Sequence, residues 1–271
     1  MNEFLRLIRL QFYNWKITPP NMIQRGVGFL TSPAGLLVKP LIKTATPLLE
    51  SVLKNSNKYI ADAIYSFSNN VTDLNALPEE EFILWLNDAD KSAKKWVKTG
   101  IATLAAEGAS TGIGGFAMLA VDIPASFGII LAYSNKIALS YQIDITTKES
   151  GLEILRAISA GSETTINGKI NSVAQMKVIS NILTRSTWKS IEKAPINSIP
   201  GMMVMVRNIL KKLGINVSER KAAQLIPVIS AVSGGAINAA WASDALEAVR
   251  QYSRMSVVEA YYMNKEKIQN L

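Results

Sequence analysis

The chain contains no cysteine and no histidine among its 271 residues. The lack of cysteine excludes a disulfide framework and fits a reducing compartment such as the cytosol. Together the two absences exclude Ser-His-Asp and Cys-His nucleophilic sites and the usual zinc sites built from His and Cys ligands. Any catalysis would have to use carboxylates, Lys, Ser, Thr or Tyr, with a hard metal on oxygen ligands as the remaining metal chemistry. No cofactor is predicted.

A continuous apolar leader is also missing, because Arg6, Arg9 and Lys16 interrupt the apolar positions at the N-terminus. This pattern differs from a secretory signal peptide, so we expect the protein to remain in the cytoplasm. Residues 2–17 instead predict a short amphipathic helix, with an apolar face made of Phe4, Leu5, Ile8 and Phe12 and with Trp15 nearby. Two interpretations stay open: a helix that lies in a membrane interface, or a terminal helix docked on the protein body.

The charge is one-sided, since 29 Lys and Arg residues against 21 Asp and Glu residues give a net charge of +8. A basic protein favours anionic partners, which include acidic lipid, an acidic protein and nucleic acid. The basic residues are spread along the chain without an aromatic-interleaved basic motif, which argues against nucleic acid. We therefore predict anionic membrane lipid as the partner, with a membrane protein as a further one, and make no prediction of oligomeric state.

The longest apolar stretch runs from Lys98 to Lys136 and contains only two charged residues, Glu107 and Asp122. We predict a helix over about 96–121, a break near Pro124, and a second helix over about 124–141. A transmembrane span is disfavoured, because an acid at mid-bilayer costs roughly 2.5 kcal/mol or more. Before this stretch, a helix that starts near Pro78 leads into a solvated basic turn with Lys91, Lys94, Lys95 and Lys98.

Small residues at helical spacing form two faces that we expect to pack together. One face carries Gly108, Gly112 and Gly115, and the other carries Ala231, Gly235 and Ala239. Such faces let two helix backbones approach closely. Because no strand pattern is convincing, the sequence predicts a single all-α domain with two glycine-rich core hairpins surrounded by amphipathic helices, including 147–160 and 244–268. Residues 1–95 would form a helical region packed on the core domain, 96–271.

The strongest candidates for a site, including a catalytic one, are Glu107 and Asp122, because acids are rarely buried without a partner. As structural alternatives, Asp122 would cap a helix that starts at Pro124, and Glu107 would bond to Lys221 or Asn238. In the functional interpretation, a polar pocket at the helix crossing would bind a lipid headgroup, a metal or a substrate. The residues considered for it are Glu107, Thr111, Asp122, Lys221, Asn238 and Asp244.

The sequence resembles the EcsC family in two motifs. The first runs from Ala106-Glu107-Gly108-Ala109 through Thr111-Gly112, Gly115-Phe116 and Asp122-Ile123-Pro124 to Tyr141 and Asp144; the second includes Lys221, Ile226-Pro227-Val228, Gly234-Gly235, Asn238 and Asp244. The resemblance covers about 96–255, with Gln142 where the family more often has glycine. It implies a helical, cytoplasmic or membrane-associated protein, because the family is named for a bacterial protein encoded with a secretion-linked ABC transporter. It implies no catalytic residues.

Three functions from different classes remain open. The favoured one is a non-enzymatic accessory protein, peripheral at the inner face of the membrane and linked to transport, secretion or another membrane process. The second is a hydrolase that acts on lipid or peptide through carboxylates. The third is a membrane-inserting or pore-forming protein, in which the glycine-rich hairpins would enter the bilayer.

Overall fold

The computed structural model describes residues 3–20, 71–111, 115–145, 148–163, 165–174 and 234–269. In these ranges every regular element is a helix and none is a strand, which confirms the predicted all-α class. The helices are α1 (Glu3–Ile17), α5 (Glu79–Thr111), α6 (Gly115–Ser140), α7 (Lys148–Gly161), α12 (Gly234–Gln269) and a short segment, 166–174.

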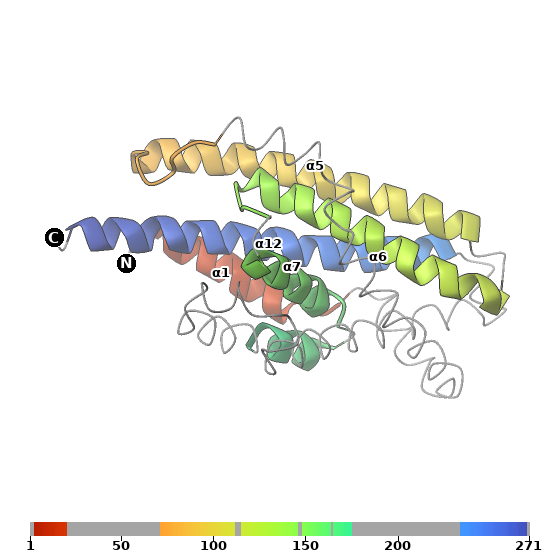
Figure 1. The fold of residues 1–271 in the computed structure, drawn as a ribbon. Helices are drawn as coiled ribbons and strands as arrows, with labels where there is room; N and C mark the ends of the chain where they lie inside the picture. Colours follow the sequence, from red (N-terminus) through yellow and green to blue (C-terminus); the bar gives the residue numbers. More distant parts are fainter. Residues whose placement is uncertain are drawn as a thin grey trace, which may run out of the picture.

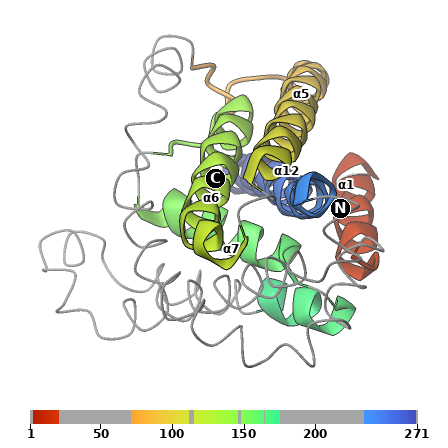
Figure 2. The same cartoon turned by 90° about the vertical axis from the view of Figure 1, so that its right-hand side faces the viewer.

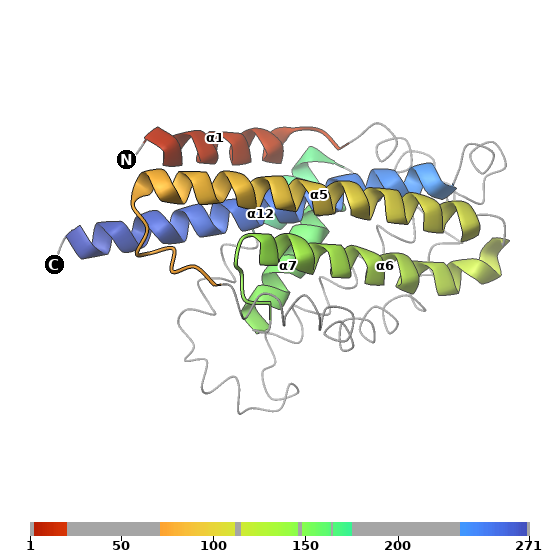
Figure 3. The same cartoon turned by 90° about the horizontal axis from the view of Figure 1, so that it is seen from above.

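The core of the fold is a bundle of the three long helices α5, α6 and α12, which lie side by side (Figures 1 and 3). Helix α12 runs antiparallel to α5. At one end the rings of Phe82 and Tyr261 stack with their centroids 3.8 Å apart. At the other end a Cβ atom on Gly235 would lie 2.7 Å from the carbonyl oxygen of Ala105. The two backbones therefore approach closely near the start of α12, which explains a glycine at this position.

The remaining described helices cover this bundle on other sides (Figure 2). Helix α7 packs on α12, where Gly161 lies directly against the backbone of Asp244 and Ala245. The indole N–H of Trp241 donates a hydrogen bond of 2.9 Å to the Ser162 hydroxyl, just after α7 ends. Trp241 is thereby buried with its one polar atom satisfied, as a buried indole requires.

Helix α1 is docked on α12, which is the second of the two interpretations of this helix. Its Leu5 and Ile8 side chains are buried in the core, and Arg9 forms an ion pair of 3.3 Å with Glu259. Its C-terminal end is fixed by Lys169, whose ammonium group donates a 2.7 Å hydrogen bond to the carbonyl of Trp15 and lies over the Trp15 ring. A lysine at this position neutralises the negative end of the helix dipole.

The structure corrects two predicted helix boundaries. Helix α5 continues without interruption from Glu79 to Thr111. The predicted turn at Lys91 to Lys98 is therefore wrong, because these lysines lie within the helix. The same helix also spans the predicted boundary between residues 95 and 96. Helix α6 starts at Gly115 and runs through Pro124, so the break near Pro124 is also wrong. A proline removes one backbone hydrogen bond, and the apolar packing of the following turns offsets that loss. Asp122 lies inside α6 and therefore does not cap a helix start.

Other predicted elements agree with the structure or lie outside it. The helices predicted at 2–17 and 147–160 correspond to α1 and α7, and the helix predicted at 244–268 is the C-terminal part of α12. Gly235 lies against Ala105 and Ala109 of α5, whereas the surroundings of Gly112, Gly115 and Ala231 lie outside the described residues. None of the described helices combines the length and the apolar character that crossing a membrane requires.

Two glycines of α7 give a matched test of the α7–α12 contact. We expect Gly161→Ala to lower the free energy of unfolding by about 2 kcal/mol, because the new methyl group would meet the backbone of α12. Gly151→Ala should raise it by up to about 1 kcal/mol, because no atom lies within 4 Å of its Cβ position and alanine favours helix. Urea denaturation of both variants measures the two changes. Equal stabilities of the two variants would contradict the close contact.

Candidate functional site

Glu107 lies where α5, α6 and α12 meet, at the end of the bundle where Gly235 packs on α5. Its Oε2 atom accepts two hydrogen bonds, one of 2.9 Å from the Ser126 hydroxyl of α6 and one of 2.7 Å from the Asn238 amide of α12. Both donors are buried. Of the two structural alternatives for Glu107, the bond to Asn238 is therefore the one that the structure shows, and this carboxylate joins one side chain from each long helix.

The other predicted site residues do not all join this cluster. Asp244 follows Asn238 by six residues on α12, about 9 Å along the helix axis. It lies on the α7 side, where its charge opposes the fall in the pKa of Lys169 that burial causes. Lys221 and the side chains of Thr111 and Asp122 lie outside the described residues. The structure thus brings together Glu107 and Asn238 and separates them from Asp244.

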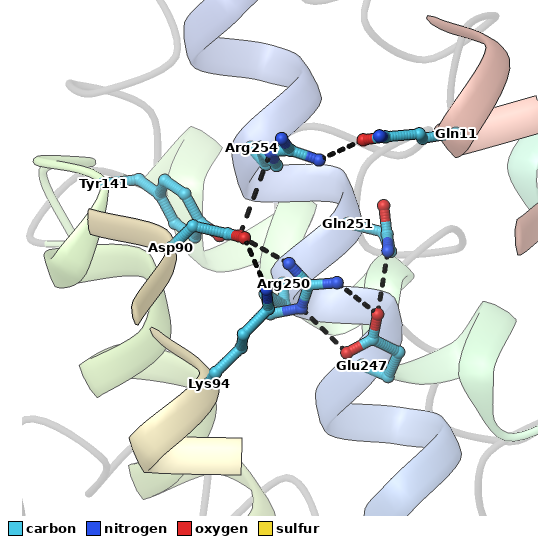
Figure 4. Close-up of polar contacts among 8 residues, drawn as sticks. All are labelled: Gln11, Asp90, Lys94, Tyr141, Glu247, Arg250, Gln251 and Arg254. Atoms are coloured by element: carbon cyan, nitrogen blue, oxygen red, sulfur yellow. Dashed lines mark hydrogen bonds and ion pairs between the residues drawn. The ribbon is translucent and has the colours of Figure 1, made fainter. Parts of the chain in front are cut away.

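A second polar cluster, which the sequence did not predict, lies in the middle of the bundle (Figure 4). Asp90 of α5 forms a buried ion pair with Arg250 of α12 and accepts a 2.6 Å hydrogen bond from the Tyr141 hydroxyl. Lys94 approaches the other carboxylate oxygen at 3.1 Å, and Arg254 lies 3.8 Å from Asp90. One carboxylate therefore holds together α5, α12 and the residue that follows α6.

Arg250 also links this cluster to a second acid. Its guanidinium group forms two hydrogen bonds to Glu247, of 2.6 and 2.8 Å, in a bidentate arrangement, and Gln251 donates a further one of 2.8 Å to Glu247. Arg254 donates a hydrogen bond to Gln11, so the network reaches α1 as well. Bidentate arginine–carboxylate pairs are among the strongest hydrogen-bonded contacts in proteins.

The charges in this cluster reinforce one another. Burial would raise the pKa of Asp90, but the Tyr141 hydroxyl, Arg250, Arg254 and Lys94 outweigh burial and hold it below its ordinary value of 3.8. Burial and the neighbouring Asp90 raise the pKa of Tyr141, so its phenol stays protonated and remains a donor. The hydrogen bonds and charge of Glu247 overcome burial and raise the pKa of Arg250. All three groups therefore hold the protonation states that the contacts need.

The turn after α6 places Tyr141 in this cluster. The N–H of Ile143 bonds to the carbonyl of Ala138 at 3.1 Å and the N–H of Gln142 to that of Leu139 at 2.9 Å, which is the Schellman arrangement. Gln142 has a φ of 55°, a conformation that favours glycine. This explains why glycine is expected at position 142.

In both clusters a carboxylate links side chains from different helices. Glu107 accepts hydrogen bonds from two buried donors. Asp90 accepts a hydrogen bond from a phenol and lies beside the guanidinium groups of Arg250 and Arg254. In the described ranges, no group of three or more carboxylates gathers in a way that could hold a metal ion. These contacts hold the long helices in register with one another.

The comparisons with known proteins agree with the sequence motifs. Residues 37–256 match the EcsC protein family, which is most of the chain. The chain belongs to the EcsC protein family. The match starts well before residue 96, so it includes all of α5 as well as the region where the two motifs lie.

A curated relative of this EcsC chain is the uncharacterized protein YdbA of Bacillus subtilis (strain 168). The two are 25% identical over 258 residues, a segment that covers 94% of this chain and 85% of YdbA. No solved structure matches the chain. The family membership rests on the match over residues 37–256, and the geometry above comes from the structure of this chain itself.

Replacing Asp90 tests the buried network. We expect Asp90→Asn to lower the free energy of unfolding by about 3 kcal/mol, because the buried Tyr141 hydroxyl loses its charged acceptor and the buried Arg250 loses one of its two carboxylate partners. Asp88→Asn removes an exposed acid two residues earlier and should change stability by no more than about 0.5 kcal/mol. Urea denaturation at neutral pH measures both, and a stable Asp90→Asn protein would contradict the proposed importance of the network.

The stability difference between wild type and Asp90→Asn should also depend on pH in a defined direction. Folding lowers the pKa of Asp90 below its ordinary value of 3.8. The contribution of the ionised carboxylate to the free energy of unfolding is therefore complete at pH values above 3.8, and it is lost as the pH falls through the lower pKa of the folded protein. The stability difference between wild type and Asp90→Asn should therefore be constant from neutral to mildly acidic pH. It should shrink only in strong acid, as measured by urea denaturation at a series of pH values.

Replacing Glu107 tests the other cluster. We expect Glu107→Leu to lower the free energy of unfolding by about 2 kcal/mol, because the buried Ser126 and Asn238 donors lose their acceptor. Glu107→Gln should cost less, because its amide oxygen can still accept both hydrogen bonds. Thermal unfolding followed by circular dichroism gives the order. If the leucine variant is as stable as the glutamine variant, the two hydrogen bonds contribute little.

Proposed function

We propose that this EcsC-family protein is a non-enzymatic accessory protein that binds the surface of an anionic membrane through the outer face of α1. The observation that carries the proposal is an apolar stripe on that face. Leu7, Leu10, Tyr13 and Ile17 have exposed fractions between 39% and 53%, although α1 already buries Leu5 and Ile8 on its other face. Helix α1 therefore has apolar residues on two faces. One face packs on α12, and the other is exposed and available for binding.

The chemistry of this stripe suits the interface of a bilayer. The four side chains recur at spacings of three and four residues, so they line one side of the helix. Arg6 is exposed on this side of α1, and Lys16 lies over the Tyr13 ring at 5.0 Å from its centroid. Cations beside aromatic and aliphatic residues are typical of helices that lie in the headgroup region.

Two steps give the binding its physical basis. The net charge of +8 attracts the protein to an anionic surface and orients it, an effect that weakens with added salt. The apolar side chains then enter the boundary between headgroups and acyl chains, with α1 still held by Lys169, Arg9 and Arg254. Since the helix is folded and docked beforehand, binding does not have to order it.

This proposal places the protein beside a membrane process such as transport or secretion, in keeping with the setting of its family. We do not propose hydrolysis, because the Oε2 atom of Glu107 accepts hydrogen bonds from two buried donors. Accessory proteins of this kind act by bringing a folded surface to the membrane, where a membrane protein can meet it.

Co-sedimentation with vesicles of phosphatidylcholine and phosphatidylglycerol tests the proposal. The double variant Leu7→Ser/Leu10→Ser keeps the net charge, and we expect it to bind at least about tenfold more weakly because two apolar side chains no longer enter the bilayer. The control Leu84→Ser/Met263→Ser removes two exposed apolar side chains from other helices and should bind like wild type. Circular dichroism verifies that each variant is folded.

The outcomes separate the two components of binding. Wild-type protein should leave the vesicles as salt is raised and should not bind vesicles of phosphatidylcholine alone. Undiminished binding of the Leu7→Ser/Leu10→Ser variant, or failure of wild type to bind anionic vesicles at low salt, would show the proposal to be wrong.

A further inference from the structure

A charged surface lies on the outer side of α5. We define the lysine face as Lys91, Lys95 and Lys98 of α5 and Lys136 of α6, together with the Trp96 ring between the two helices. The three lysines of α5 are exposed, whereas Ala93, Val97 and Gly100 on the opposite side of the helix are buried. The lysine face is therefore the outer surface of a helix whose inner surface belongs to the core.

The positive charge of this face is only partly compensated. Lys91 pairs with Asp88 at 2.8 Å. In the described part of the chain, no carboxylate forms an ion pair with Lys95, Lys98 or Lys136. Lys136 and Lys95 instead lie over the Trp96 ring, at 4.7 and 5.8 Å from its centroid. Cation–π contacts hold an ammonium group in place and leave its charge available to an anion.

The spacing of the lysines gives the face a direction. Lys91, Lys95 and Lys98 follow one another at four and three residues, so they form a straight row about 10 Å long on one side of α5. The partner that this row fits best is another helix with acidic residues at the same spacing, laid along α5. Charge rows of this kind fix partner and orientation in paired helices.

We propose that the lysine face docks an acidic helical segment of a partner protein. This inference is independent of the membrane-binding proposal, since it uses none of the residues of α1. A bilayer bound to the outer side of α1 is a poorer occupant of the face, because α1 and α5 lie on different sides of α12 (Figure 2). Nucleic acid is also poorer, because lysine ammonium groups lie over the Trp96 ring and compete with base stacking.

A synthetic peptide serves as the probe. It is a fluorescent helical peptide with glutamates at positions i, i+4 and i+7 on one face, compared with a scrambled peptide of the same composition. Fluorescence anisotropy at low salt should show tighter binding of the patterned peptide to the full-length protein. Lys95→Glu/Lys98→Glu should weaken that binding by about tenfold, because two attractive pairs become repulsive.

The matched control is Lys265→Glu/Lys267→Glu, which makes the same change in net charge near the end of α12. It should weaken peptide binding less than about twofold, because charges far from the lysine face are screened by salt. Circular dichroism confirms that both variants are folded. Equal binding of patterned and scrambled peptides, or equal losses in the two variants, would overturn the proposal.

Two further measurements address the other occupants. If Lys95→Glu/Lys98→Glu loses vesicle binding and Lys265→Glu/Lys267→Glu does not, the lysine face meets the bilayer and the protein partner is wrong. If a short DNA duplex displaces the patterned peptide and binds more tightly through the same lysines, the face is a nucleic-acid site. Vesicle binding that is equal in the two variants, together with selective loss of the patterned peptide, supports the proposal and leaves the function of α1 to its own test.

Discussion

The ion pair between Asp90 and Arg250 is the contact around which the bundle is arranged. Both charges are buried, so each would be costly without the other, and together they align α5 with α12. A slip of one turn between these helices would break the Asp90–Arg250 contact and leave each charge with only the partner on its own helix, Lys94 for Asp90 and Glu247 for Arg250. Apolar contacts such as that of Phe82 with Tyr261 supply cohesion but tolerate small shifts. The polar cluster therefore specifies the register, while the apolar core supplies most of the stability.

The two proposed surfaces follow from this arrangement. Because α12 is covered by α1 on one side and by α5 on another, the outer faces of those two helices look in different directions (Figure 2). One is apolar with a few cations and suits a bilayer, and the other is a row of lysines and suits an acidic helix. A peripheral protein that holds a membrane on one face and a protein on another would bring the two together.

The sequence predicts the helices better than their contacts. Apolar periodicity places α1 and α7, and it identifies Leu5 and Ile8 as the buried side of α1, because one helix alone determines those features. The bond from Asn238 to Glu107 was predictable because few polar residues stand on these apolar faces. The pairing of Asp90 with Arg250 was not, because periodicity does not show which turns of two helices meet; the i, i+3 and i, i+4 spacing of Glu247, Arg250 and Arg254 was the available signal. The break predicted near Pro124 was wrong because proline weakens a helix without always ending it.

The antiparallel pairing of α5 with α12 also has a consequence for how the chain folds during synthesis. Tyr261 stacks on Phe82, and Tyr262 donates a hydrogen bond to Glu79. The first turns of α5 therefore pack against the C-terminal part of α12. These contacts cannot form until Tyr262, which follows Glu79 by 183 residues, has left the ribosome. Until then the part of α5 that packs on α12 remains exposed to solvent, although α6 can already pack on its neighbouring side.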